Sequence, residues 1–252
     1  MKKFFTMNFT KFFHLFIGAI AVAICLMACN NNDADWSIYY PNALVTVRPT
    51  AEGGCDLQLD DNTTLKPVNI SKSPFGDKEV RALTNFSPSK ESAAPYNKAV
   101  FVNWIDSILT KNAISVEQML PDYNYGNNPV EIVRDWVTIA EDGYLTLRFR
   151  TVWGNIGRVH YVNLITGVNP GNPYEVEFRH NANGDTYGFV RDGIVAFRLD
   201  GLPDTKGKTV KLTLKWQSFS GPKMAHFDYR TRTATSAESS SISEVRPVIK
   251  IE

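Results

Sequence analysis

The sequence predicts an all-β protein built from two modules, and three observations lead to this prediction. Apolar and polar residues alternate in short runs, which is the pattern of strands with one solvated face. Turn-forming residues separate these runs at intervals of about ten residues. Aromatic residues make up 12% of the chain, and Val, Ile and Thr are frequent, which favours strands over helices.

The first predicted module spans residues 37–118 and contains about five strands. Its runs lie at residues 44–48, 56–60, 64–65, 79–83 and 99–105. The turn Glu52-Gly53-Gly54 joins the first two of them. Residues 119–129 then contain Pro121, Gly126 and Pro129 without any periodicity, so we place a domain boundary at 118/119.

The second predicted module spans residues 119–230, and its pattern is clearer. The pair Asp142-Gly143 joins two alternating runs, and a two-residue link of this kind is a strong hairpin signal. About seven or eight strands are expected, which suits a two-layer sandwich. Residues 231–252 are Ser/Thr-rich and are expected to form a flexible tail, in which Pro247 limits a terminal strand at 245–251 to a sheet edge.

The first 28 residues have the layout of an export signal. Lys2, Lys3 and Lys11 form a basic start, and an almost wholly apolar run covers residues 12–28. The densest part of this run is short for a membrane-spanning helix, which needs about 20 residues. A cleaved signal peptide at residues 1–28 is therefore preferred to a permanent transmembrane anchor.

Leu26-Met27-Ala28-Cys29 resembles the lipobox of bacterial lipoproteins. In that motif the small residue admits the scissile bond to the peptidase, and the thiol takes the lipid. We expect cleavage between Ala28 and Cys29 and lipid attachment at Cys29, with several acyl chains to hold the protein stably. Residues 29–36 would form a polar tether. The protein is thus expected at the outer membrane, lipid-anchored, and facing the periplasm or the cell surface.

Charge and cysteine usage exclude other classes of protein. The signal carries three lysines and no acid, so the mature chain keeps 24 of the 27 basic residues against 26 acidic ones, a net charge of −2. A nearly neutral body offers no electrostatic footprint for nucleic acid. Once Cys25 is removed and Cys29 is lipidated, only Cys55 remains, so no internal disulfide is expected. Cys55 is expected to be an unreactive thiol beside a turn, with intermolecular pairing as the alternative.

We find no constellation of catalytic or metal-binding residues. His160, His180 and His226 lie on separate segments and lack metal-ligand spacing. A nucleophile elbow, a phosphate loop and a dinucleotide fingerprint are all absent from the sequence. Residues 181–185 superficially resemble a calcium loop but fit a hairpin turn better. The sequence therefore predicts a non-enzymatic protein without cofactor or metal; an enzyme would need groups from both modules to converge.

Three tryptophans are candidates for stacking on a sugar: Trp136, Trp153 and Trp216. Trp216 continues an apolar face and is expected in the core. Trp153, beside Gly154, is expected to be exposed and is our candidate ligand contact. The strand arginines are expected to form cross-strand ion pairs on solvated faces, although an anion-binding face remains an alternative.

Four stretches resemble the NigD-like lipoproteins. They are residues 57–67 (LQLDDNTTLKP), 104–111 (WIDSILTK), 144–150 (YLTLRFR) and 160–164 (HYVNL). The resemblance implies an N-terminal OB-like barrel followed by a C-terminal β-sandwich. It also implies a link to bacteriocin immunity, a role proposed for the family from gene neighbourhood, and it brings no catalytic residues.

The sequence supports two hypotheses about the function. The first is a non-enzymatic, membrane-anchored lipoprotein that binds another macromolecule, with bacteriocin immunity as the role implied by the family. The second is a carbohydrate-binding accessory lipoprotein of a glycan-uptake system, suggested by the aromatic-rich second module. In both cases the partners are a membrane, reached through the lipid, and an unidentified protein or glycan.

Overall fold

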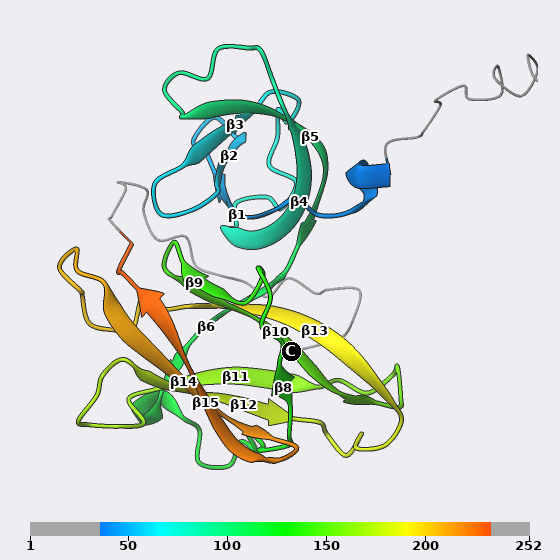
Figure 1. Cartoon of the computed structure of the whole chain (residues 1–252), viewed down its shortest axis with the longest axis vertical. Helices are drawn as coiled ribbons and strands as arrows, with labels where there is room; N and C mark the ends of the chain where they lie inside the picture. The colour runs from blue at the N-terminus through cyan, green and yellow to red at the C-terminus, as the bar shows by residue number, and fades with distance from the viewer. Residues whose placement is uncertain (1–35, 233–252) are drawn as a thin grey trace, which may run out of the picture. The chain divides into compact units, whose positions relative to one another are not determined.

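The computed structural model describes residues 36–232, which are almost entirely β-structure (Figure 1). This confirms the predicted all-β class. The helical elements of this part are two short 3-10 turns, η1 (Trp36–Tyr39) and η2 (Val116–Gln118). Neither is long and apolar enough to cross a bilayer. The predicted signal peptide, Cys29 and the tail from residue 233 onward lie outside the described residues.

The first domain is a closed five-stranded barrel with strand order β1-β2-β3-β5-β4. Its strands are β1 (Ala43–Pro49), β2 (Cys55–Gln58), β3 (Thr64–Pro67), β4 (Val80–Pro88) and β5 (Lys98–Ser107). They coincide with the runs of alternating residues in the sequence. Alternate side chains, such as Val45, Val47 and Leu57, fill the interior and are fully buried. The fold is the expected OB-like barrel.

The second domain is a sandwich of two five-stranded sheets. One sheet has the order β6 (Leu109–Asn112), β13 (Phe189–Arg198), β10 (Tyr144–Trp153) and β8 (Glu131–Ile132), and β9 (Ile139–Glu141) also pairs with β10. The other has the order β15 (Gly221–Tyr229), β14 (Val210–Ser218), β12 (Glu175–Asn181), β11 (Tyr161–Thr166) and β7 (Ile114–Ser115). Leu145, Leu147 and Phe149 share the face of β10 that packs in the core, as their alternation predicts.

The domain boundary lies earlier than the predicted position at 118/119. The barrel ends at Ser107, and β6 and β7 already belong to the two sheets of the sandwich. Ile108 is the one residue between β5 and β6, and its amide still donates to the Arg81 carbonyl of β4 at 2.8 Å. The Pro- and Asn-rich residues 119–129 are a loop inside the sandwich. Turn-forming residues mark a loop whether or not it separates two domains.

The predicted hairpin at Asp142-Gly143 is confirmed. Both residues have positive φ, 48° and 74°, and the strands on either side, β9 and β10, pair antiparallel. Positive φ at both central residues is what a tight hairpin turn with right-handed twist requires. The turn carries the Asp142 side chain into the contact between the two domains.

Candidate functional site

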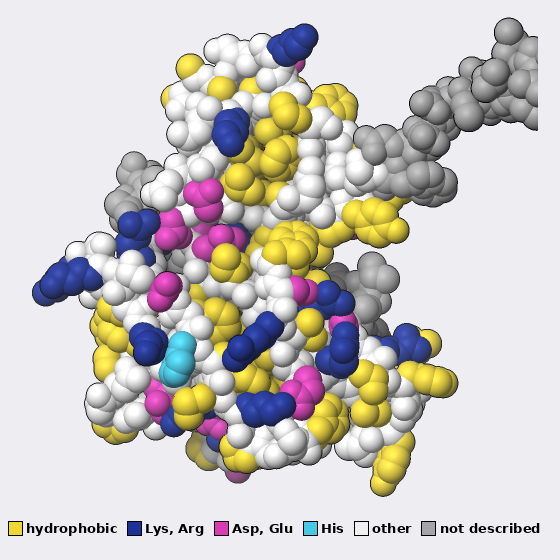
Figure 2. Space-filling view, in the orientation of Figure 1, with side chains coloured by type: hydrophobic (Ala, Val, Ile, Leu, Met, Phe, Trp, Pro, Cys, Tyr) yellow, Lys and Arg dark blue, Asp and Glu magenta, His cyan; other side chains and the backbone are white. Residues whose placement is uncertain are grey.

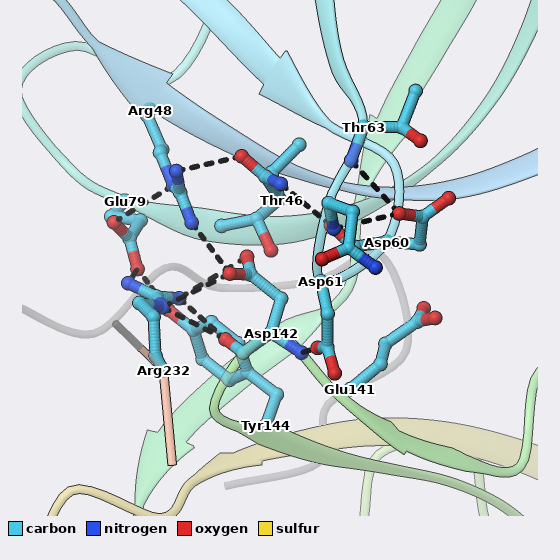
Figure 3. A network of polar contacts seen from close by, with 12 residues as sticks. Thr46, Arg48, Asp60, Asp61, Thr63, Glu79, Glu141, Asp142, Tyr144 and Arg232 are labelled. Atoms are coloured by element: carbon cyan, nitrogen blue, oxygen red, sulfur yellow. Dashed lines mark hydrogen bonds and ion pairs between the residues drawn. The ribbon is translucent and has the colours of Figure 1, made fainter. Parts of the chain in front are cut away.

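The contact between barrel and sandwich is a buried network of charged side chains (Figure 3). Its centre in the barrel is Arg81 on β4, whose side chain has 0% exposure. The guanidinium donates to Glu141 at 2.6 Å and to the Thr46 hydroxyl at 3.0 Å. A buried charge persists only when its hydrogen bonds are satisfied, so Arg81 locks β9 of the sandwich against the barrel.

Glu79 accepts hydrogen bonds from several segments of the chain. Its Oε1 accepts hydrogen bonds from the Tyr144 hydroxyl at 2.7 Å, from Arg198 at 2.8 Å and from Arg232 at 2.8 Å. Burial opposes ionisation of this carboxyl, but Arg232, Tyr144 and Arg198 together hold its pKa below the usual range. Glu79 is therefore ionised near neutral pH and ties the barrel to three parts of the sandwich.

Asp142 is the second acidic centre of the network. Its carboxylate accepts from Arg48 of the barrel at 2.5 Å and lies 3.1 Å from Arg232. Burial raises the pKa of this carboxyl, and the guanidinium groups of Arg232 and Arg48 oppose that rise. The side chains involved are nearly all paired with one another, which is the arrangement of a structural joint.

A polar cavity of about 210 Å³ opens beside this network. Its lining combines guanidinium, carboxylate, amide and hydroxyl groups from both domains: Arg48, Gln58, Asp61, Asn62, Thr64, Asp142, Arg230, Thr231 and Arg232. Such groups hydrogen-bond hydroxyl-rich ligands. Among the described residues no cluster of His, Cys, Asp and Glu has the geometry of a metal site.

Two residues of the predicted flexible tail are in fact held in place. Thr231 exchanges hydrogen bonds with Thr205 at 2.9 and 3.0 Å. Arg232 donates to the Asp142 carbonyl at 2.9 and 2.7 Å and also pairs with Glu79. The sequence did not indicate these contacts, because the residues that bind Thr231 and Arg232 lie far away in the chain.

The structure brings together two of the three histidines considered in the sequence. His160 Nδ1 lies 2.9 Å from His180 Nε2, and His160 Nε2 lies 3.3 Å from Asp185. Both rings are buried, and burial, followed by the neighbouring His160, lowers the pKa of His180 to about 4. The pair is therefore neutral near pH 7. His226 lies apart on β15, where it is exposed and bonded to Thr213 at 3.2 Å.

Asp185 and two glycines clamp together two loops of the sandwich, the one after β10 and the one after β12. The Asp185 carboxylate accepts the amides of Gly154 at 3.1 Å and Asn155 at 3.0 Å. The backbones also touch: a Cβ on Gly154 would lie 2.0 Å from the Tyr187 carbonyl oxygen, and one on Gly188 would lie 2.3 Å from the Gly154 Cα. The absence of a side chain at these positions therefore permits the contact.

The clamped loops and the start of β13 carry four strongly exposed apolar side chains. Ile156 is 88% exposed, Tyr187 85%, Phe189 76% and Val190 63%. We call these four residues the apolar loop cluster. Figure 2 shows hydrophobic side chains at the lower right edge, around the two loops that follow β10 and β12 in Figure 1. Large apolar groups gathered on a rigid loop pair mark an interaction site more often than scattered ones do.

The expectation of an exposed Trp153 is wrong. Its side chain is only 7% exposed, and its ring packs 4.8 Å from that of His160, centre to centre. The neighbouring Gly154 suggested an open turn, but the indole packs in the core of the sandwich, beside Phe149 and His160. The structure thus gives no support to Trp153 as a ligand contact. Trp216 is in the core as predicted, and Trp136 is 51% exposed, away from the apolar loop cluster in the sequence.

The predicted charge pairing of the strand arginines is confirmed for β10. Arg148 and Arg150 both bond Asp192 on the neighbouring strand β13, Arg150 at 2.7 Å. Arg198 differs, because it lies in the domain contact and pairs with Glu79 at 2.8 Å. Cys55 is a free and buried thiol, and burial, together with Asp56, raises its pKa to about 11. It is therefore unreactive, as expected.

The chain matches known families in both of its domains. Residues 44–108 match the NigD-like N-terminal OB domain, and residues 112–229 match the NigD-like C-terminal β-sandwich domain. No curated protein is significantly similar to it. Each match covers one domain, and the contact between the two domains was not predicted from the sequence.

Solved structures support the same relationship. A protein from Parabacteroides distasonis ATCC 8503, described as toxin-related, is 35% identical with a TM-score of 0.63, and the match covers 75% of this chain and 92% of that one. A NigD-like immunity protein from Bacteroides caccae ATCC 43185 is 19% identical with a TM-score of 0.54, covering 76% and 99%. A protein from Bacteroides fragilis NCTC 9343, described as a lipoprotein, is 12% identical with a TM-score of 0.50, covering 77% and 98%. The latter two share the fold alone. The two domain matches together cover most of the chain, which therefore belongs to the NigD-like family.

Proposed function

We propose that this protein is a non-enzymatic lipoprotein of the outer membrane that binds a protein partner through the apolar loop cluster. The exposure of Ile156, Tyr187, Phe189 and Val190 is the observation that carries the proposal. Exposing such side chains to water is unfavourable, and a partner that covers them gains about 25 cal/mol for each Å² of apolar surface removed from water. The clamp beneath them reduces the entropy lost on binding.

The anchor is the second part of the proposal. The sequence Leu26-Met27-Ala28-Cys29 supports acylation at Cys29 after removal of residues 1–28. The folded domains would then lie at a bilayer surface, facing the periplasm or the cell exterior. Mass spectrometry of the purified protein tests this directly. A diacylglyceryl-modified Cys29 as first residue is expected, and an unmodified thiol there would overturn the anchor.

Bacteriocin immunity is the biological role that we propose for this binding. One relative of the same fold is a NigD-like immunity protein, and the 35% identical relative is described as toxin-related. To test this role, the gene is deleted in the bacterium that makes this protein, and the sensitivity of that bacterium to bacteriocins from related strains is measured. We expect higher sensitivity after deletion, restored by the intact gene but not by Phe189→Asp. Unchanged sensitivity across all toxins tested would contradict the role.

A saccharide is the second candidate ligand, and the polar cavity at the domain contact favours it. The cavity is large enough for about one sugar ring, and its arginine, carboxylate and amide groups suit hydroxyls. A glycan array probed with the purified protein tests this function, with Asn62→Ala as the matched cavity variant. Retention that is lost in Asn62→Ala is expected. Failure to retain any glycan would remove this candidate.

A further inference from the structure

One edge of the sandwich is open for part of its length. β13 pairs with β10 from Phe189 to Arg198, but its other side pairs with β6 only from Val195 onward. Among residues 36–232, no strand pairs with residues 189–194 on that side. The cause is the course of the chain, which leaves the barrel at Ser107 and can begin β6 only at Leu109.

The backbone groups that face this open edge follow from the alternation of hydrogen bonds. The Leu199 amide donates to Gly143, toward β10, whereas the Arg198 carbonyl accepts from Ala113, on the β6 side. Successive residues of a strand point their amide and carbonyl groups to opposite sides. Val190, Asp192 and Ile194 therefore direct theirs toward the open edge.

We propose that an extended, acidic segment of the partner protein adds as a strand to β13 at residues 189–194. This inference rests on the proposed function and specifies its surface and the chemistry of the partner. The added strand would continue the line of β6 and would end where β6 begins. Strand addition of this kind derives its affinity from main-chain hydrogen bonds and its specificity from alternate side chains.

The apolar loop cluster overlaps this edge. Phe189 and Val190 are the first two residues of β13, and consecutive side chains point to opposite faces of a sheet. A strand laid along the edge would therefore cover Phe189 with side chains on one face and Val190 with those on the other. Two of the four residues of the apolar loop cluster thus lie on the same six residues of chain as the unpaired backbone.

The charges around the edge favour acidic residues in the partner. On one face of the sheet, Arg148 and Arg150 pair with Asp192 and Asp135, so these four charges balance. Arg191 follows the alternation to the other face, where it is exposed and adds one positive charge beside the open edge. An added strand with glutamate at the positions on that face would bring carboxylates within reach of Arg191, and opposite charges on neighbouring strands attract.

A membrane is a poorer occupant of the same surface. The hydrocarbon region of a bilayer offers no hydrogen bonds, so the free amide and carbonyl groups of Val190, Asp192 and Ile194 would remain unpaired there at considerable cost. The Arg150–Asp192 ion pair would also have to lose water. A peptide strand satisfies the backbone groups and leaves the ion pair at the surface.

The first test uses the full chain and a blocked peptide of about ten residues that alternates Glu and Val. Amide hydrogen exchange is followed by NMR, and we expect exchange at Asp192 and Ile194 to slow by about tenfold when the peptide is bound. Two control peptides each change one property of this peptide, either its backbone amides or its charge. One is N-methylated at every second residue, and the other carries Lys in place of Glu; we expect both to bind about tenfold more weakly. Equal binding of the N-methylated peptide would overturn strand addition.

Variants of the protein provide the second test. Val190→Pro removes one amide that faces the open edge and none that pairs with β10, and proline is tolerated where the amide faces solvent. We expect it to weaken peptide binding by about tenfold. Arg191→Glu is expected to weaken binding similarly, while Lys211→Glu, the same charge change at an exposed position of β14, leaves it unaltered. Protection of the same amides by phosphatidylglycerol vesicles without peptide would overturn the proposal in favour of a membrane.

The outcome is separable from the proposed function. In the producing bacterium, photo-crosslinking from position 156 reports whether any protein partner contacts the apolar loop cluster. A partner captured equally by the wild type and by Val190→Pro refutes strand addition and leaves partner binding intact. Absence of any crosslinked protein refutes partner binding, whereas the peptide experiment still decides whether the edge accepts a strand.

Discussion

The domain contact buries charged side chains, whereas the end of the sandwich that carries the apolar loop cluster (the loop end) exposes apolar ones. At the contact, charged groups such as Arg81, Glu79 and Asp142 are buried and paired with one another. At the loop end, apolar groups such as Tyr187 and Phe189 are exposed, and one side of β13 at residues 189–194 pairs with no strand of the described chain. A buried polar cluster whose members are mostly paired indicates a structural role, whereas exposed apolar groups beside free backbone groups indicate a binding surface.

The largest effect is expected from breaking the domain contact at Arg81. Arg81→Met removes the guanidinium that bonds Glu141 and Thr46 and leaves that carboxylate without its partner. We expect the free energy of unfolding to fall by about 3 kcal/mol, measured by urea denaturation. Lys223→Met, which breaks an exposed pair with Glu131, is the control and should cost less than about 1 kcal/mol. A loss at Arg81 no greater than at Lys223 would contradict the structural role.

Acid should lower the free energy of unfolding, because the buried pair of His160 and His180 resists protonation in the folded protein. The pKa of His180 in the folded protein, about 4, lies below its ordinary value of 6.5, so the unfolded chain binds a proton more readily. Stability is fully present above pH 6.5 and falls as the pH drops toward 4, by about 3 kcal/mol. Below pH 4 this contribution is constant.

Denaturation curves at several pH values test this dependence. His180→Phe should flatten the curve between pH 6.5 and 4, whereas His226→Gln, on exposed β15, should keep the wild-type shape. If His180→Phe follows the wild-type slope throughout, another group is responsible.

A smaller loss of stability is expected from substitution of Arg232, the last residue that the structure describes. Arg232→Ala removes hydrogen bonds to the Asp142 carbonyl and to Glu79, and we expect a loss of about 1 to 2 kcal/mol in urea denaturation. Arg230→Ala, which breaks a more exposed pair with Asp61, should cost less than about 1 kcal/mol. Equal losses would mean that Arg232 does not join the domains.

The smallest effect on stability should come from the apolar loop cluster. Phe189→Ser exchanges an exposed ring for a small polar group, so the free energy of unfolding should change by no more than about 0.5 kcal/mol. The same variant should abolish capture of the partner. A loss of stability above about 1 kcal/mol would show that Phe189 belongs to the core and not to a binding surface.

Much of the fold was predictable from local patterns, whereas the contacts between distant segments were not. The Asp142-Gly143 turn and the core face of β10 follow from local chemistry and alternation. β6 and β7 escaped prediction because strands of four and two residues are too short to show a period. Arg81 occupies a polar position in an alternating run, and only the docking of the sandwich shows that this position is buried.

The binding surface shows the same limit. His160 and His180 meet because of the register of β11 and β12, which the sequence does not specify. Trp153 was assigned to the surface from its glycine neighbour, yet its ring packs in the core against His160, a residue from another strand. Phe189 and Val190 begin a strand, and the sequence does not show that the start of this strand lacks a neighbour on one side among the described residues.

The short stretch 109–115 has an evolutionary consequence. It follows the barrel directly and supplies the edge strand β6 to one sheet and β7 to the other. Recombination within residues 119–129 would deprive the sandwich of both edge strands and would expose the sheets to aggregation. Exchange of these modules between genes would have to occur ahead of Leu109, or else carry barrel and sandwich together as one inherited unit.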